Sequence, residues 1–197
     1  MSFVTPGEVV GHLHLADKMV VADLGAGTGA YCFALADLIK RENIQEATIY
    51  AVDVQKAMLE HLRADIAHRG YSGIETLWAD IEVPGGVKLA DRICDAVVIS
   101  NVLFQSEPEA RTVLAREAVR ILKPGGQMLV LDWTGSFGSM GPHPAQVMTA
   151  AMAKELLTKA GLTVANEFSA GSHHWGLLLR RAALQSTIAR HDFDEIT

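Results

Sequence analysis

The chain has 197 residues, of which 49% are hydrophobic and 20% are charged, and its formal net charge at pH 7 is −6. This length fits one domain with a core of ordinary size, and the apolar share excludes wholesale disorder. We expect no nucleic-acid partner, because binding to the phosphate backbone depends on clustered Lys and Arg, which an acidic chain without a basic run does not supply.

Cysteine content and hydropathy predict the compartment. Cys32 and Cys94 are the only cysteines, too few for a disulfide framework or a thiolate metal site, so we expect no metal and a reducing environment. The first 15 residues lack the basic start and apolar run of a secretory signal. No stretch approaches the roughly 18 apolar residues that a membrane span needs. The prediction is a soluble, cytoplasmic protein without a membrane span.

The first half of the chain predicts alternating helices and strands. Residues 5–8, Thr-Pro-Gly-Glu, have the pattern of a helix start with a capping box, and a short helix should follow to about residue 15. Apolar runs, helical spacing and β-branched stretches then predict a strand at 19–24, a helix at 28–41, a strand at 48–53, a helix at 55–69 closed by Gly70, and a strand at 74–79.

The second half continues this alternation and then departs from it. It predicts a strand at 95–100, a helix at 107–122 stopped by Lys-Pro-Gly-Gly, a strand at 127–131, a helix at 145–160, and strands at 162–168 and 174–181. Alternation requires a parallel sheet covered on both faces, because parallel strands need crossover connections. The last two strands are too close for a crossover, so the last strand should be antiparallel. We expect one α/β domain at 18–181, after a helical segment at 1–17 and before a tail at 182–197.

A glycine-rich turn joins the first predicted strand to the first long helix. It begins at Asp23 and contains Gly25, Gly27 and Gly29, and this edge of an open α/β sheet is where ligands bind. Gly25, Gly27 and Ala30 also fit the dinucleotide fingerprint, so a nicotinamide or flavin enzyme is an alternative. Asp23 favours a cationic ligand instead, because a carboxylate repels a pyrophosphate and attracts an ammonium or sulfonium group.

Two more carboxylates end the second and third predicted strands. Asp53 is placed to accept hydrogen bonds from both hydroxyls of a ribose, and Asp80 to accept from the exocyclic amine of adenine. Each of the three aspartates would alternatively serve as the N-cap of the next helix. Three acidic strand ends in succession indicate a site for a ribonucleoside that carries positive charge.

Five segments share the order and spacing of one family. They are 21–29 around the glycines, 50–53, 79–80, 95–101 and 122–126. In this combination the chain resembles the class I S-adenosylmethionine-dependent methyltransferases. It is most similar to the small-molecule branch that includes ubiquinone and menaquinone C-methyltransferases and arsenite methyltransferase-like proteins. The resemblance implies a Rossmann-like, doubly wound sheet of seven strands, mostly parallel, with an antiparallel last strand.

The resemblance also implies S-adenosylmethionine as the cofactor, and it assigns the binding residues. Asp23 and the glycine turn would hold the methionine moiety, Asp53 the ribose, Asp80 and Ile81 the adenine, and the segment after the fourth strand would lie near the sulfonium. The expected cofactor residues are Asp23, Gly25, Ala26, Gly27, Gly29, Asp53, Val54, Asp80, Ile81, Asn101 and Val102.

Methyl transfer makes no catalytic side chain compulsory, because the cofactor supplies the leaving group and the protein supplies alignment. Asp132 and His143 are the candidates for a general base, and His173 and His174 are further candidates. Arsenite chemistry is disfavoured, since two cysteines are too few to hold the metalloid. The leading hypothesis is in-line methyl transfer to a small or medium-sized acceptor. The alternative is a non-catalytic module that binds S-adenosylmethionine or a partner.

Overall fold

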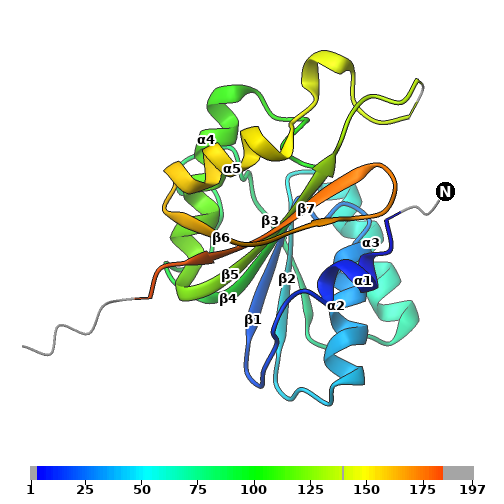
Figure 1. Cartoon of the computed structure of the whole chain (residues 1–197). Coiled ribbons are helices and arrows are strands. Elements are labelled where there is room, and N and C mark those ends of the chain that lie inside the picture. The colour runs from blue at the N-terminus through cyan, green and yellow to red at the C-terminus, as the bar shows by residue number, and fades with distance from the viewer. Residues whose placement is uncertain (1–3, 139, 184–197) are drawn as a thin grey trace, which may run out of the picture.

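A seven-stranded sheet forms the centre of the computed structural model, which describes residues 4–138 and 140–183 (Figure 1). The strand order is β3-β2-β1-β4-β5-β7-β6. β7 is antiparallel to both of its neighbours, and the other six strands run in one direction. The strands are β1 (Val20–Leu24), β2 (Thr48–Asp53), β3 (Ile74–Trp78), β4 (Cys94–Ser100), β5 (Leu122–Trp133), β6 (Leu162–Ser169) and β7 (His174–Arg181). This topology confirms the predicted doubly wound sheet with an antiparallel last strand.

Helices cover both faces of the sheet. On one face lie α1 (Pro6–Val10), α2 (Ala30–Arg41) and α3 (Lys56–Arg69), and on the other lie α4 (Pro108–Ile121) and α5 (Ala150–Lys159) (Figure 1). Val21 of β1 belongs to the core under α1 and α2, whereas Ala22 and Leu24 belong to the core under α4 and α5. Successive strand residues point to opposite faces, so β1 is apolar at nearly every position because both faces are buried.

The ends of the sheet determine where a site can form. The order of the strands reverses between β1 and β4, and open α/β sheets bind ligands beside the carboxyl ends of the strands at such a switch point.

Gly70 ends α3 with a left-handed conformation, φ 69°, as predicted. None of the helices in the described ranges is long and apolar enough to cross a membrane.

Three predicted details are wrong. Thr5 makes no side-chain cap bond, and α1 has only five residues. β5 begins at Leu122 and not at residue 127, because Leu122 already pairs with Cys94 of β4, and residues 123–126 form an irregularity before the pairing resumes at Gln127. The helix predicted from residue 145 begins at Ala150, since Thr149 accepts a hydrogen bond from the Met152 backbone and caps the helix there. A short 3-10 turn, η1 (Pro144–Gln146), precedes it. Residues 184–197 of the predicted tail lie outside the described residues.

Candidate functional site

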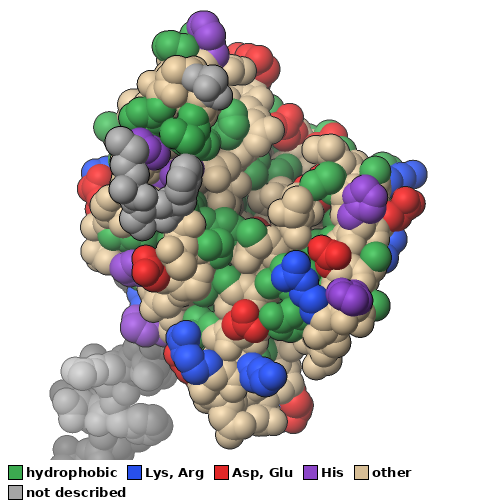
Figure 2. Space-filling view, turned by 90° about the vertical axis from the view of Figure 1, so that its right-hand side faces the viewer, with side chains coloured by type: hydrophobic (Ala, Val, Ile, Leu, Met, Phe, Trp, Pro, Cys, Tyr) green, Lys and Arg blue, Asp and Glu red, His purple; other side chains and the backbone are tan. Residues whose placement is uncertain are grey.

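A cleft of about 380 Å³ opens beside the carboxyl ends of β1, β2, β3 and β4. This volume lies within the range of about 300–1,000 Å³ that is typical of small-molecule pockets. Figure 2 shows a hollow with hydrophobic side chains around it in the upper half of the view. The lining residues are Gly25, Gly27, Asp53, Val54, Gln55, Asp80, Ile81, Glu82, Val102, Gln105 and Ser106.

The glycine loop forms one wall of the cleft by close backbone approach. Gly25, Gly27 and Gly29 have φ values of 79°, 51° and 80°, a conformation that residues with a Cβ rarely adopt. A Cβ on Gly25 would lie 2.4 Å from Cγ2 of Val102, and one on Gly29 would lie 2.4 Å from Cδ1 of Leu62. Glycine therefore lets this loop pass beside the segment after β4 and lets α2 begin against α3.

Asp53 is the carboxylate that the structure holds most firmly at the cleft. Its side chain is 6% exposed and lines the cleft, as predicted from its position at the end of β2. Oδ2 accepts a hydrogen bond from the Gly27 backbone at 2.9 Å, and Oδ1 accepts one from the Gln55 backbone at 2.8 Å. A carboxylate offers about four acceptor positions, so about two remain for a ligand.

Asp80 and Ile81 lie on the opposite wall, after β3. Ile81 is buried and Asp80 is exposed, with its Oδ1 accepting a hydrogen bond from the Glu82 backbone at 2.9 Å. Ala79 donates a backbone hydrogen bond to the carbonyl of Asp53, which keeps this wall beside the end of β2. Both residues therefore line the cleft, and their binding of the adenine stays a prediction.

Arg120 of α4 holds the segment that continues from this wall. Its guanidinium donates to the backbone carbonyls of Val87 and Leu89 at 2.6 and 2.9 Å, and to the carboxylate of Asp91 at 2.7 Å. It is also paired with Glu117, which in turn accepts a hydrogen bond from the Val87 backbone. The hydrogen bonds with Arg120 lower the pKa of Glu117, although burial opposes that shift. Arg120 is thus a positioning residue that the sequence pattern did not indicate.

Asp23 lies beneath the glycine loop and not among the lining residues. It is 1% exposed, and its Oδ2 accepts a hydrogen bond from the thiol of Cys32 at 3.2 Å. Burial raises the pKa of Asp23 to about 7, the thiol hydrogen bond opposes the shift, and the charge of Asp53 adds to it. Between about pH 4 and pH 7 the folded chain therefore holds a proton that the unfolded chain has lost. Rising pH in this window lowers the free energy of unfolding.

Asn101 and Val102 follow β4, where the cleft meets the end of the sheet. Val102 lines the cleft, but Asn101, Ala26 and Gly29 do not, although all four were expected to bind the cofactor. Asn101 has a φ of 55°, and its backbone carbonyl accepts a hydrogen bond from Gln105 at 2.6 Å. Asn101 therefore shapes the turn that carries Val102 and Gln105 into the cleft.

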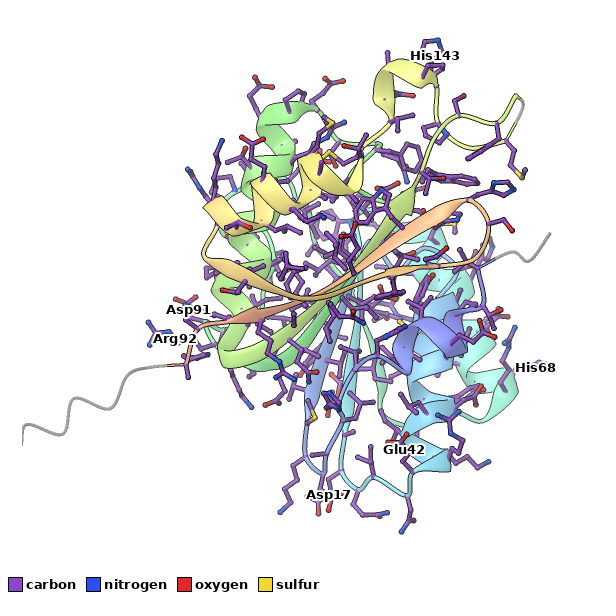
Figure 3. The ribbon with its side chains drawn as sticks, viewed as in Figure 1. Asp17, Glu42, His68, Asp91, Arg92 and His143 are labelled. Atoms are coloured by element: carbon purple, nitrogen blue, oxygen red, sulfur yellow. The ribbon has the colours of Figure 1, made fainter. Side chains whose placement is uncertain are left out.

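The two candidate bases lie away from the cleft. Asp132 is fully buried, and its two oxygens accept hydrogen bonds from the backbones of Phe104 and Trp133 at 3.0 and 2.8 Å. Burial raises the pKa of Asp132 to about 6. His143 is exposed, its Nδ1 accepts a hydrogen bond from the Ala145 backbone, and it points outward from the tip of its segment (Figure 3). The geometry gives Asp132 a role in fixing the segment after β4 and gives His143 a capping role.

Four lining residues were not among the expected cofactor residues: Gln55, Glu82, Gln105 and Ser106. Each comes within a few residues of a predicted strand end, which was the only available signal. Within residues 4–138 and 140–183, no group of three or more His, Cys, Asp and Glu side chains could hold a metal ion. The site is therefore built from a glycine loop, two wall segments and the carboxylate that joins them.

Residues 15–182 match the family described as a methyltransferase domain. The chain therefore belongs to this family, among the class I S-adenosylmethionine-dependent methyltransferases, as the sequence motifs predicted. S-adenosylmethionine is accordingly the cofactor that the family implies. The residues at the cleft fit this cofactor. Asp53 is a buried carboxylate with spare acceptor positions, and it faces the cleft where a ribose would lie.

Relatives agree with this membership. The chain is 33% identical over 122 residues to an arsenite methyltransferase of Aquipseudomonas alcaligenes, covering 60% of this chain and 34% of that protein. It is 32% identical over 112 residues to a cypemycin N-terminal methyltransferase of Streptomyces sp., covering 56% of this chain and 40% of that protein. The chain thus spans between a third and two fifths of the length of these relatives.

Solved structures support the fold alone. A S-adenosylmethionine-dependent methyltransferase from Aquifex aeolicus superimposes with a TM-score of 0.78 at 23% identity, with 90% of each chain covered. The [4+2]-cyclase SpnF superimposes with a TM-score of 0.74 at 16% identity, covering 90% of this chain and 80% of that one. The scaffold is therefore shared by proteins whose names describe different reactions.

Proposed function

We propose that the chain binds S-adenosylmethionine in the cleft and transfers its methyl group to a small or medium-sized acceptor by in-line displacement. The observation that carries the proposal is Asp53. Its carboxylate is held by the backbones of Gly27 and Gln55, which fixes its orientation, and it keeps acceptor positions for two neighbouring hydroxyls. A ribose offers those hydroxyls.

The remaining lining fits the other parts of the cofactor. Val54 and Ile81 supply apolar surface for a planar base, and the adjacent Asp80 carboxylate supplies an acceptor for its amine. The methionine end would lie toward the glycine loop, above Asp23. An ammonium group there would favour the charged carboxylate and so oppose the rise in the pKa of Asp23 that burial causes.

The chemistry requires little of the protein beyond position. When bound, the cofactor supplies an activated methyl carbon and a neutral thioether leaving group. The chain's own residues bind the cofactor, orient the methyl group toward the acceptor and exclude water from the cleft. The glycine loop and the turn at Asn101 serve this purpose, because both bring rigid backbone close to the ligand.

The acceptor is proposed to be a small organic molecule and not arsenite. The two relatives described above carry names for very different acceptors, a metalloid and a peptide N-terminus. Cys32 and Cys94 are the only cysteines, and both are buried, so they do not offer a set of accessible thiolates. A cytoplasmic location and the absence of a nucleic-acid partner stay predictions from composition.

Calorimetric titration with S-adenosylmethionine, S-adenosylhomocysteine and NADH tests the cofactor. We expect the first two to bind and NADH not to bind. Asp53→Asn should weaken S-adenosylmethionine binding by about 100-fold, because two hydrogen bonds to a charged acceptor contribute about 3 kcal/mol. Glu42→Gln is the matched control, since Glu42 is an exposed carboxylate at the opposite end of the molecule (Figure 3).

Turnover separates an enzyme from a binding module. S-adenosylmethionine would be incubated with the protein and a library of acceptors, and mass spectrometry would detect products heavier by one methyl group. Preferred binding of NADH would refute the proposed cofactor. Tight binding of S-adenosylmethionine without methylated product from the library or from cell extract would instead favour a non-catalytic module.

A further inference from the structure

Trp78 is the last residue of β3 and lies beside the cleft without lining it. In the parallel pairing of β2 with β3, it is the partner of Asp53, the carboxylate that faces the cleft. Its side chain is 44% exposed and belongs to neither of the two buried core clusters. Its hydrogen bond and its ring contacts join it instead to the segments that form the walls of the cleft.

The indole of Trp78 holds the wall after β2 through its one hydrogen-bond donor. Nε1 donates to the backbone carbonyl of Val54 at 2.9 Å, and Val54 follows Asp53 directly and lines the cleft. The same peptide unit ends in the N–H of Gln55, which donates to Oδ1 of Asp53 at 2.8 Å. The C=O and N–H of a trans peptide lie in one plane and point in opposite directions. Trp78 and the Asp53 carboxylate therefore hold this unit from its two sides.

The ring of Trp78 connects this wall to the segment after β3. Nζ of Lys56, at the start of α3, lies 4.4 Å from the ring centroid, and Nζ of Lys88 lies 5.2 Å from it. Both distances are within the roughly 6 Å over which an indole ring attracts an ammonium group. Arg120 binds the backbone carbonyls on both sides of Lys88. Trp78 therefore lies between the start of α3 and a segment that is anchored from α4.

The space beside the ring is too small for a ligand of its own. A cavity of about 190 Å³ lies between Trp78 and α3, below the roughly 300 Å³ of the smallest typical small-molecule pockets. Its lining residues are Lys56, Leu59, Glu60, Arg63 and Trp78. The contacts of Trp78 therefore bear on the neighbouring cleft.

We propose that Trp78 is a positioning residue for the adenosine half of the cofactor and acts through the peptide unit between Val54 and Gln55. This inference rests on the proposed function. The indole N–H holds that unit so that the side chain of Val54 faces the base and the carboxylate of Asp53 faces the ribose. The ring keeps the two wall segments beside each other. Trp78 itself contacts neither the cofactor nor the reacting atoms.

The hydrogen bonds around Asp53 set the size of the effect. Its other oxygen, Oδ2, is held independently by the Gly27 backbone, so loss of the indole N–H loosens one oxygen and leaves the other in place. The loss of affinity should therefore be about fivefold, the factor for one ordinary hydrogen bond. It should affect adenosine and S-adenosylhomocysteine equally, because the methionine half lies toward the glycine loop.

Nuclear magnetic resonance on the full chain labelled with ¹⁵N in tryptophan tests the connection to the cleft. The chain has three tryptophans, and the indole signals that disappear in Trp78→Phe and in Trp175→Phe identify those two. We expect adenosine to shift the indole N–H signal of Trp78. The signal of Trp175 should stay unchanged, since its N–H donates to the Met148 carbonyl beneath α5. An unshifted Trp78 signal at saturating adenosine would overturn the proposal.

A graded pair of variants tests the role of the side chain in calorimetry. Trp78→Phe keeps a ring and removes the N–H, and it should raise the Kd of adenosine and of S-adenosylhomocysteine by about fivefold. Trp78→Leu also removes the ring contacts with the two lysines and should raise both Kd values by about 20-fold. Tyr71→Phe is the matched control. It removes the single donor of an aromatic side chain, bonded to Asp37 at 2.7 Å, in the segment before β3, and should leave both Kd values unchanged.

A merely structural role would give a different result, because the variants would then lower the free energy of unfolding in urea without changing the Kd of the folded protein. Unchanged Kd values in Trp78→Phe, or a loss for S-adenosylhomocysteine without a loss for adenosine, would refute the role of Trp78 alone. Failure of both ligands to bind the wild-type protein would refute the proposed function and this inference with it.

Discussion

Gly25→Ala tests the closest backbone approach in the cleft. The added Cβ would lie 2.4 Å from Cγ2 of Val102, well inside van der Waals contact, and the φ of 79° is itself unfavourable for alanine. Val102 is β-branched and has few alternative rotamers, so it cannot turn away without cost. The substitution should therefore destabilise the fold and narrow the cleft at the same time.

The magnitude follows from two separate contributions. A left-handed backbone at a residue with a Cβ costs about 1–2 kcal/mol. The overpacking against Val102 costs a further 1–3 kcal/mol, roughly, as for an extra methyl group in a packed region. Gly70→Ala isolates the first contribution, because Gly70 has a similar φ of 69° and nothing within 4 Å of its added Cβ. The difference between the two variants then measures the steric contact alone.

Urea unfolding and calorimetric binding of S-adenosylmethionine provide the two measurements. Gly25→Ala should lower the free energy of unfolding by about 2–5 kcal/mol and weaken binding, whereas Gly70→Ala should cost about 1–2 kcal/mol and leave binding unchanged. Adding Val102→Ala to Gly25→Ala should recover part of the stability. Equal destabilisation by the two glycine variants, or no recovery in the double variant, would refute the contact as the cause.

Three further variants probe buried charge and loop position. In the wild-type protein, Asp23 should lower the free energy of unfolding by about 4 kcal/mol as the pH rises from 4 to 7. Asp23→Asn should abolish this decrease, as measured by urea unfolding at both pH values. Arg120→Ala should weaken S-adenosylmethionine binding about tenfold by releasing the wall segment, with partial recovery in Arg120→Lys, as measured by calorimetry. Asp132→Leu leaves two backbone N–H groups without an acceptor and releases the segment after β4, so it should lower the free energy of unfolding by about 2–4 kcal/mol in urea unfolding and weaken S-adenosylmethionine binding in calorimetry.

Local sequence patterns were sufficient for most of the fold. The continuous apolar run of β1 and the helical spacing of α2 depend on burial of whole faces, so they are visible in the chain itself. The start of α5 was predicted five residues early, because the competing Thr149 cap and the η1 turn depend on how the preceding segment packs. The early start of β5 was hidden for the same reason, since Leu122 pairs with Cys94 of β4 before an unpaired Pro-Gly-Gly stretch that would normally precede a strand.

The lining of the cleft was predictable where a single element defines it. Gly25 and Gly27 were found because a left-handed turn between a strand and a helix requires glycine. Arg120 was not found, because its role depends on carbonyls of Val87 and Leu89, which lie about 30 residues away and carry no side-chain signal. Residues that act through distant backbone groups leave no local pattern in a sequence.

The aspartates at strand ends show why residue type and position do not determine a role. Asp23, Asp53 and Asp132 each end a parallel strand or lie one residue from its end, and each is buried, yet only Asp53 faces the cleft. Asp132 has both oxygens bound by backbone amides and is enclosed by neighbouring segments, so its carboxylate fixes structure. Asp53 also binds two amides, but the loops around it leave its remaining acceptor positions open to a ligand. The packing of the loops therefore separates a carboxylate that faces the cleft from one that fixes structure.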